Sequence, residues 1–127
     1  PRAVQRLQKN DQITFLHYDT HSHEVIEQAE AIVVVNNTIG YESIYFQKPL
    51  ISVGNPTYTD TPAVTTVNDL ENLPEVLSEQ ISTTVTEERT IESIYSLQES
   101  TWKGNIVSYD AENVQMLVKS ILEFIEE

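Results

Sequence analysis

The feature that most constrains the fold is an unbroken apolar run, Ala-Ile-Val-Val-Val at residues 31–35, which ends abruptly in Asn36, Asn37 and Thr38. A strand that is apolar at every position is typical of a parallel sheet covered on both faces. Residues 39–46 have the spacing of a short helix, which ends before Pro49. We therefore expect residues 32–35 to form a central strand with helices on each side.

The same alternation of strand and helix patterns continues along the chain, and it predicts an α/β fold, a Rossmann-like partial domain with a three- to four-stranded parallel sheet. Strands are expected at residues 13–17, 31–35, 50–53 and 64–67. Ser22 is expected to cap a helix over residues 23–29, with Glu24 in its first turn.

The C-terminal third is predicted to be helical. Asn68 or Asp69 is expected to cap a helix that reaches residue 81 and that begins at, or is kinked by, Pro74. A second helix is expected over residues 86–100. Asp110 is expected to cap a final helix with a wide apolar face, formed by Val114, Leu117, Val118, Ile121, Leu122 and Ile125.

Composition limits the kinds of molecule that the chain can bind. The 127-residue chain is about one domain long, and its 20 acidic and 7 basic residues give a net charge of −13. Nucleic-acid binding is disfavoured because it needs clustered Lys and Arg. The acidity fits either ordinary solubility or a saline intracellular environment. There is no cysteine for a disulfide, and no apolar run approaches the roughly 18 residues of a membrane span.

The turn after residues 31–35 is the best candidate for chemistry. It connects a buried strand directly to a helix, whose first N–H groups lack partners within the helix and suit a phosphate. Thr38 can cap this helix or offer its hydroxyl to a phosphate, and Gly40 leaves room for a ligand near the backbone. Glu42 can accept hydrogen bonds from a ribose diol. The same residues also fit plain helix capping, and pattern alone leaves both readings open.

A family resemblance favours ligand binding. Residues 36–43 (Asn-Asn-Thr-Ile-Gly-Tyr-Glu-Ser), residues 47–49 (Gln-Lys-Pro), Gly54 and Tyr58 resemble the signature of the capsule polysaccharide biosynthesis proteins, a group of GT-B glycosyltransferases. Two positions depart from the family pattern. Asn37 stands where the family usually has Ser. Gln47 replaces a Gly at the helix exit, where a non-Gly residue in the left-handed conformation costs roughly 1 kcal/mol.

The resemblance implies that residues 1–127 form a single domain, the later part of a GT-B C-terminal domain in a longer cytoplasmic protein. It implies nucleotide-sugar binding by Asn37, Thr38, Gly40 and Glu42, with the turn on the phosphate and Glu42 on the ribose. The expected partners are a nucleotide-sugar donor and, through another domain, a polysaccharide or lipid-linked acceptor. No cofactor and no metal is expected. Pro1 resembles the end of a Lys-x-His-Pro segment, so the catalytic residues are expected upstream of it.

Two other functions stay open: a non-catalytic nucleotide-binding or assembly module, and a fragment of a GT-B nucleotide-sugar epimerase. The epimerases show a Ser-Gly-Gly turn followed by paired Glu residues, and residues 36–43 contain neither feature. Residues 18–23 contain Asp19, His21 and His23, for which a base or ribose contact is expected rather than a metal. Lys48 is expected to point to solvent, and Trp102 and Tyr109 to anchor the C-terminal helices.

Overall fold

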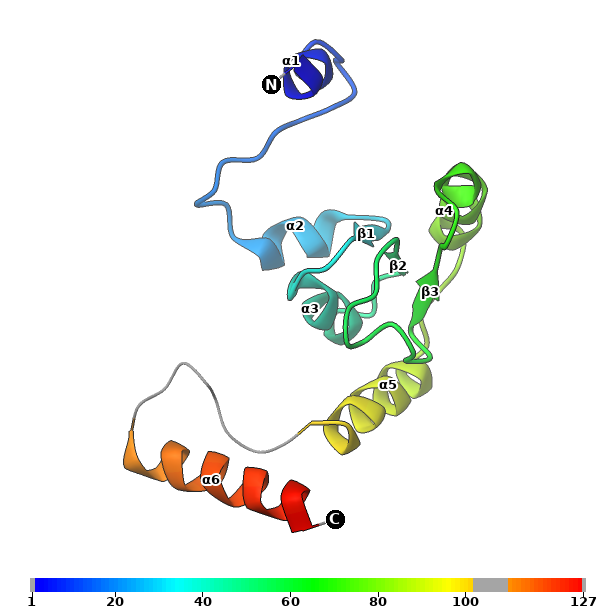
Figure 1. Ribbon diagram of the computed structural model, residues 1–127. Coiled ribbons are helices and arrows are strands. Elements are labelled where there is room, and N and C mark those ends of the chain that lie inside the picture. Colours follow the sequence, from blue (N-terminus) through cyan, green and yellow to red (C-terminus); the bar gives the residue numbers. More distant parts are fainter. Residues whose placement is uncertain (1, 102–109, 127) are drawn as a thin grey trace.

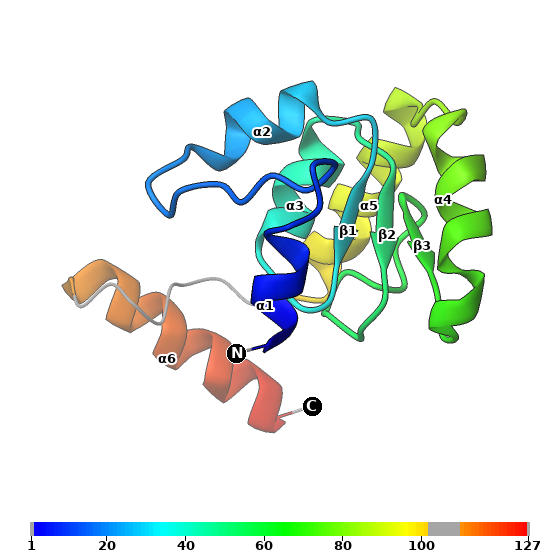
Figure 2. The ribbon, with the colours of Figure 1, turned by 90° about the horizontal axis from the view of Figure 1, so that it is seen from above.

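The computed structural model describes residues 2–101 and 110–126 (Figure 1). Its centre is a parallel sheet of three strands in the order β1-β2-β3, seen side by side in Figure 2. The strands are β1 (Ile32–Val34), β2 (Leu50–Ser52) and β3 (Val64–Thr66). The α/β class and the parallel sheet predicted from the sequence are confirmed.

Six α-helices and one short 3-10 helix complete the described part of the chain. They are α1 (Arg2–Leu7), α2 (Ser22–Gln28), α3 (Ile39–Tyr45), η1 (Leu70–Asn72), α4 (Leu73–Ile81), α5 (Glu87–Glu99) and α6 (Ala111–Glu126). The predicted helical C-terminal third is therefore present. Trp102 and Tyr109, which were expected to anchor it, lie outside the described residues.

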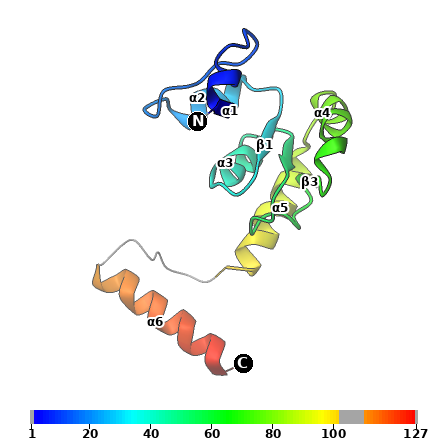
Figure 3. The ribbon, with the colours of Figure 1, turned by 45° about the horizontal axis from the view of Figure 1, so that its top comes forward.

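Helix α3 connects the sheet to the helices around it. It packs against β1 and β2 and also against α2 and α5, and Figures 1 and 3 show it between these two helices. The buried cluster at this junction draws on residues from distant parts of the sequence, namely Val34, Ile44, Leu50, Tyr58, Ala63 and Val85. The residues of α3 are consequently held from several sides, which fixes the start of this helix in space.

Two strand predictions are wrong. Residues 13–17 form no strand, and Ile13, Phe15 and Leu16 are exposed. Strand β1 is an edge strand, because it pairs with β2 alone, and Val33 is 43% and Val35 66% exposed. The central strand is β2, whose three residues are all buried. A strand pattern is realised only where a neighbouring strand pairs with it, and no described segment pairs with the outer edge of β1.

The C-terminal helices begin at the residues that the sequence indicated. Asp69 accepts a hydrogen bond from the Glu71 N–H at 3.0 Å, and Asp110 accepts one from the Asn113 N–H at 2.8 Å. Pro74 lies in the first turn of α4, so this helix begins there and is not kinked by it. Of the six residues of the apolar face predicted for α6, Leu117 is partly buried and the other five are exposed. Helix α6 lies away from the sheet in Figures 1, 2 and 3.

The end of α3 explains the second departure from the family pattern. Gln47 has a φ of 55°, in the left-handed region, as expected for the residue at that position. Its N–H donates to the Ile44 carbonyl at 3.1 Å, and the Lys48 N–H donates to the Ser43 carbonyl at 3.0 Å. These two bonds form a Schellman motif, which normally uses Gly at the left-handed position. Gln47 therefore carries the conformational cost that the sequence analysis assigned to it.

Candidate functional site

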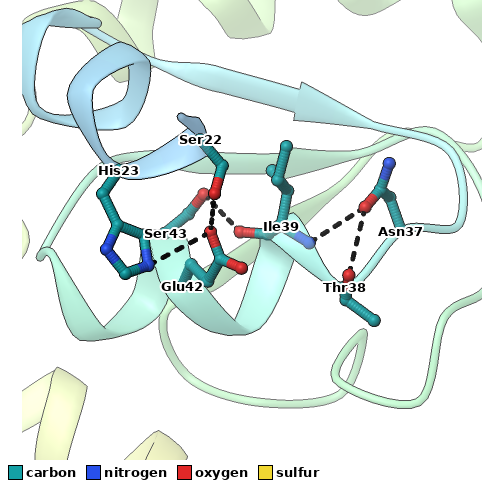
Figure 4. Close-up of polar contacts among 7 residues, drawn as sticks. All are labelled: Ser22, His23, Asn37, Thr38, Ile39, Glu42 and Ser43. Carbon is teal, nitrogen blue, oxygen red and sulfur yellow. Dashed lines mark hydrogen bonds and ion pairs between the residues drawn. The ribbon is translucent and has the colours of Figure 1, made fainter. Parts of the chain in front are cut away.

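The candidate site begins at the turn between β1 and α3, at the carboxyl end of β1. The Asn37 side-chain oxygen accepts a hydrogen bond from the Ile39 N–H at 3.0 Å (Figure 4). Thr38 occupies the N-cap position but makes no capping bond, and its hydroxyl lies 3.5 Å from the same Asn37 oxygen. The capping role that the sequence allowed for Thr38 is therefore performed by Asn37.

The next two amide groups of α3 also have partners within the turn. The Gly40 N–H donates to the Asn37 carbonyl at 3.2 Å, and the Tyr41 N–H donates to the Thr38 carbonyl at 3.0 Å. Together with the Ile39 N–H, three consecutive amides at the start of α3 are hydrogen-bonded inside the protein. The backbone N–H groups that were expected to bind a phosphate thus already have acceptors within the protein.

Glu42 lies one turn further along α3 and is held by α2. The Ser22 hydroxyl donates to Glu42 Oε2 at 2.7 Å, and His23 Nε2 lies 3.7 Å from the same oxygen. The His23 ring also packs on Phe46, with the ring centroids 5.2 Å apart. Because the Glu42 side chain is 33% exposed, its carboxylate is oriented by α2 and still accessible to a ligand (Figure 4).

Ser22 has a different role from the predicted one. It is the first residue of α2, the N-cap position falls on His21, and no side chain caps this helix. The Ser22 hydroxyl is directed instead to Glu42, 20 residues further along the chain. No local sequence signal reveals such a long-range contact, because capping and cross-helix bonding use the same residue type.

Gly40 is buried in α3, and the space beside its Cα is filled by the ring of Tyr58. Tyr58 is 1% exposed and donates its hydroxyl to the Asn37 carbonyl at 2.6 Å. Burial raises the pKa of the Tyr58 phenol, so its hydroxyl remains a donor at neutral pH. Because Gly40 has no side chain, the ring of Tyr58 can pack directly against its Cα. That a ligand also approaches the Gly40 backbone stays a prediction.

An open pocket of about 400 Å³ adjoins the start of α2, lined by His21, Ser22, His23 and Glu24. Among the residues that the structure describes, no group of three His, Asp or Glu side chains gathers as a metal site would require. His17 lies 3.5 Å from Asp19 and so belongs to a separate pair. The structure therefore brings Ser22, His23 and Glu42 together and leaves Asp19 outside this cluster.

Lys48 lies at the far end of α3 from the turn, as the sequence indicated. Its ammonium group does not extend freely into solvent, since it donates to the Glu27 carbonyl at 2.7 Å. This bond connects the end of α2 to the end of α3, while the Ser22–Glu42 bond connects their beginnings. The two helices are therefore held together at both ends, which keeps the Glu42 carboxylate in place.

The capping geometry makes a prediction about two neighbouring residues. Asn37→Ala removes the acceptor of the Ile39 N–H, so it should cost about 1 kcal/mol of unfolding free energy. Thr38→Ala removes a hydroxyl without a capping bond and should change stability by less than about 0.5 kcal/mol. Urea unfolding of the two variants measures both values. A larger loss for Thr38→Ala than for Asn37→Ala would contradict the capping assignment.

Within the part of the chain that the structure describes, no helix is both long and apolar enough to span a membrane. No curated protein and no solved structure matches the chain at a significant level. A model of the capsule polysaccharide biosynthesis proteins matches residues 2–75, which is more than half of the chain and includes the whole candidate site. The chain therefore belongs to the capsule polysaccharide biosynthesis protein family, and its role is in capsule synthesis.

Proposed function

We propose that this chain binds the nucleotide-sugar donor of a glycosyltransferase that builds capsule polysaccharide. The observation that carries the proposal is the Glu42 carboxylate, which Ser22 and His23 orient at the carboxyl end of β1 while leaving it one-third exposed. Open parallel sheets bind their ligands at this edge. A fixed carboxylate with accessible lone pairs is suited to accept hydrogen bonds from the two hydroxyls of a ribose.

The proposal extends to the whole protein. The fold is interpreted as the later part of a GT-B C-terminal domain, with the catalytic groups and the acceptor-binding domain in other parts of a longer chain. The acceptor would be a growing polysaccharide or a lipid-linked precursor, and the reaction would occur in the cytoplasm. On this interpretation the 127 residues bind donor but transfer no sugar by themselves.

Nucleotide titration tests the proposal. Cytidine, uridine and guanosine diphosphates are added to the protein, and NMR follows the amides of residues 39–43, on the helix that carries Glu42. We expect one nucleotide to shift these amides with micromolar to millimolar affinity. Glu42→Gln should weaken that binding about 5- to 30-fold, the equivalent of about 1–2 kcal/mol for charge-assisted hydrogen bonds.

The control is Glu27→Gln, which removes one negative charge from α2 without touching the Glu42 carboxylate. It should leave the affinity unchanged within about twofold, since an exposed charge is largely screened by salt. If all three nucleotides leave the amides of residues 39–43 unmoved, the turn is only a helix start and donor binding is refuted. An equal loss in both variants would show that charge, and not the oriented carboxylate, governs binding.

A further inference from the structure

We propose that this chain has a second binding site, a groove at the amino ends of its strands that holds an uncharged segment of a polysaccharide. The candidate donor site lies at the opposite, carboxyl end of β1, and the two sites share no residue. The inference goes beyond donor binding and does not depend on it. It rests on the side chains that line the groove, on their charge and on the backbone conformation of Gln47.

The groove lies where α2, α3 and α4 end. Glu30 precedes β1 and Pro49 precedes β2, so both residues mark the amino edge of the sheet. Residues 83–85, between α4 and α5, also line the groove. Figure 2 shows the α2–β1 and α4–α5 connections at this same end of the sheet. The volume of the groove is about 420 Å³, which falls within the roughly 300–1,000 Å³ of ligand pockets.

Polar side chains dominate the lining of this groove. Six of its ten lining residues are polar or charged, whereas most ligand pockets are lined by hydrophobic and aromatic residues. Within the described part of the chain, the side chains of Gln28, Gln47 and Thr84 have no hydrogen-bond partner. Each Gln amide offers an acceptor oxygen and two N–H donors, so it can bond two neighbouring hydroxyls. Ala29 and Ile81 add apolar surface that can pack against the C–H groups of a sugar ring.

The charge of the groove favours an uncharged ligand. Among the described residues that line it, Lys48 and Glu30 carry opposite charges, and no other lining residue is charged. The Lys48 ammonium group already donates to the Glu27 carbonyl at 2.7 Å, so part of its donor capacity is used. An anionic ligand would also be repelled by a chain with a net charge of −13, and salt would screen this repulsion. A polymer rich in hydroxyls and free of charge avoids the repulsion.

The backbone of Gln47 is strained at this groove. Its φ of 55° lies in the left-handed region, which glycine adopts without steric cost and other residues do not. Among the described residues, no hydrogen bond to the Gln47 side chain compensates for this cost. Strained residues of this kind gather at ligand sites, where the side chain has a use outside the folded chain itself. The strain therefore supports a ligand contact by the Gln47 amide.

Such a site would hold the polymer rather than the reacting sugar. The groove and the candidate donor site lie at opposite ends of α3, a helix of seven residues that is roughly 10 Å long. Because the family acts in capsule synthesis, a polysaccharide is the product that the chain would encounter. Even weak binding in the groove would raise the effective concentration of that polymer beside the rest of the protein.

Titration of the unmodified protein with oligosaccharides tests the proposal. Cellohexaose and isomaltohexaose are the uncharged probes and a hyaluronan hexasaccharide is the anionic one, and NMR follows the amides of residues 28–30, 47–48 and 83–85. We expect at least one uncharged hexasaccharide to shift these amides with millimolar affinity, while the amides of residues 39–43 stay unmoved. The anionic probe should bind several-fold more weakly in low salt, and the difference should narrow in molar KCl.

Two variants separate ligand binding from folding. Gln28→Ala should weaken binding of the uncharged hexasaccharide about 3- to 10-fold, and Gln98→Ala, the matched change at an exposed glutamine of α5 outside the groove, should leave it unchanged. Gln47→Gly should weaken binding to a similar degree and yet raise the urea concentration at which the protein unfolds, because it removes the left-handed strain. A purely structural Gln47 would give the stability gain alone.

Four results would overturn the proposal. The first is that neither uncharged hexasaccharide moves the groove amides, and the second is that the shifts occur at residues 39–43 instead. The third is that hyaluronan binds more tightly than both uncharged probes in low salt. The fourth is that an uncharged peptide rich in Thr and Val binds the groove more tightly than any hexasaccharide, which would make it a protein-docking surface. Failure of the nucleotide titration would refute donor binding and leave this proposal standing.

Discussion

Replacing Gly40 with alanine is expected to destabilise the fold by about 2–3 kcal/mol, although alanine is the better helix former by about 1 kcal/mol. The added Cβ would overlap the Tyr58 side chain at the ring atoms Cζ and Cε2 and at the hydroxyl oxygen Oη. This ring is 1% exposed and is hydrogen-bonded to the Asn37 carbonyl, so it has little freedom to move aside. The overlap therefore outweighs the gain in helix propensity. Urea unfolding measures the difference in unfolding free energy.

Changing Tyr58 together with Gly40 tests whether overlap with the Tyr58 side chain causes this loss of stability. In a Tyr58→Val background the ring is gone, so Gly40→Ala should become neutral or stabilise by up to about 1 kcal/mol. Tyr58→Phe is the matched control, because it keeps the ring atoms that overlap the new Cβ and should preserve the loss. A similar loss in all three backgrounds would mean that Gly40 is required for a reason other than Tyr58.

The sequence predicted most of the fold because its strongest signals are local. Three of the four predicted strands are present, and the helix starts at Asp69 and Asp110 are confirmed. The left-handed position of Gln47 was likewise predicted from a short pattern. Each of these features depends on residues within a few positions of one another, where capping and backbone sterics decide the conformation.

The failures concern features that depend on distant residues. The apolar run of residues 31–35 indicated a central strand, but the position of a strand in its sheet depends on which segments pair with it. The family pattern identified Gly40, Glu42 and Tyr58 without showing how they are arranged. Neither the ring of Tyr58 over Gly40 nor the Ser22–Glu42 bond could be predicted, since each joins residues about 20 positions apart.

Gly54→Ala is expected to destabilise the fold at least as much as Gly40→Ala, by about 3 kcal/mol of unfolding free energy. A Cβ on Gly54 would overlap the backbone carbonyl oxygen of Val35 and come within 2.8 Å of its carbonyl carbon. A flexible side chain can move away from such a contact, but this neighbour is main chain. Its position is fixed because the adjoining Val53 N–H donates to the Val34 carbonyl at 2.9 Å. The strain can be relieved only by moving β1 away from β2.

The position of Val35 gives this variant a second consequence. Val35 is followed directly by the turn in which Asn37 caps α3, so a displaced Val35 carbonyl should disturb that cap as well as the sheet. We therefore expect NMR shift changes in Gly54→Ala at residues 36–40, in addition to the loss of stability. Asn55→Ala is the control, because Asn55 is the exposed neighbour of Gly54 and its replacement should cost less than about 0.5 kcal/mol. If Gly54→Ala unfolds at the same urea concentration as Asn55→Ala, the close approach of Gly54 to Val35 does not hold β1 and its turn in place.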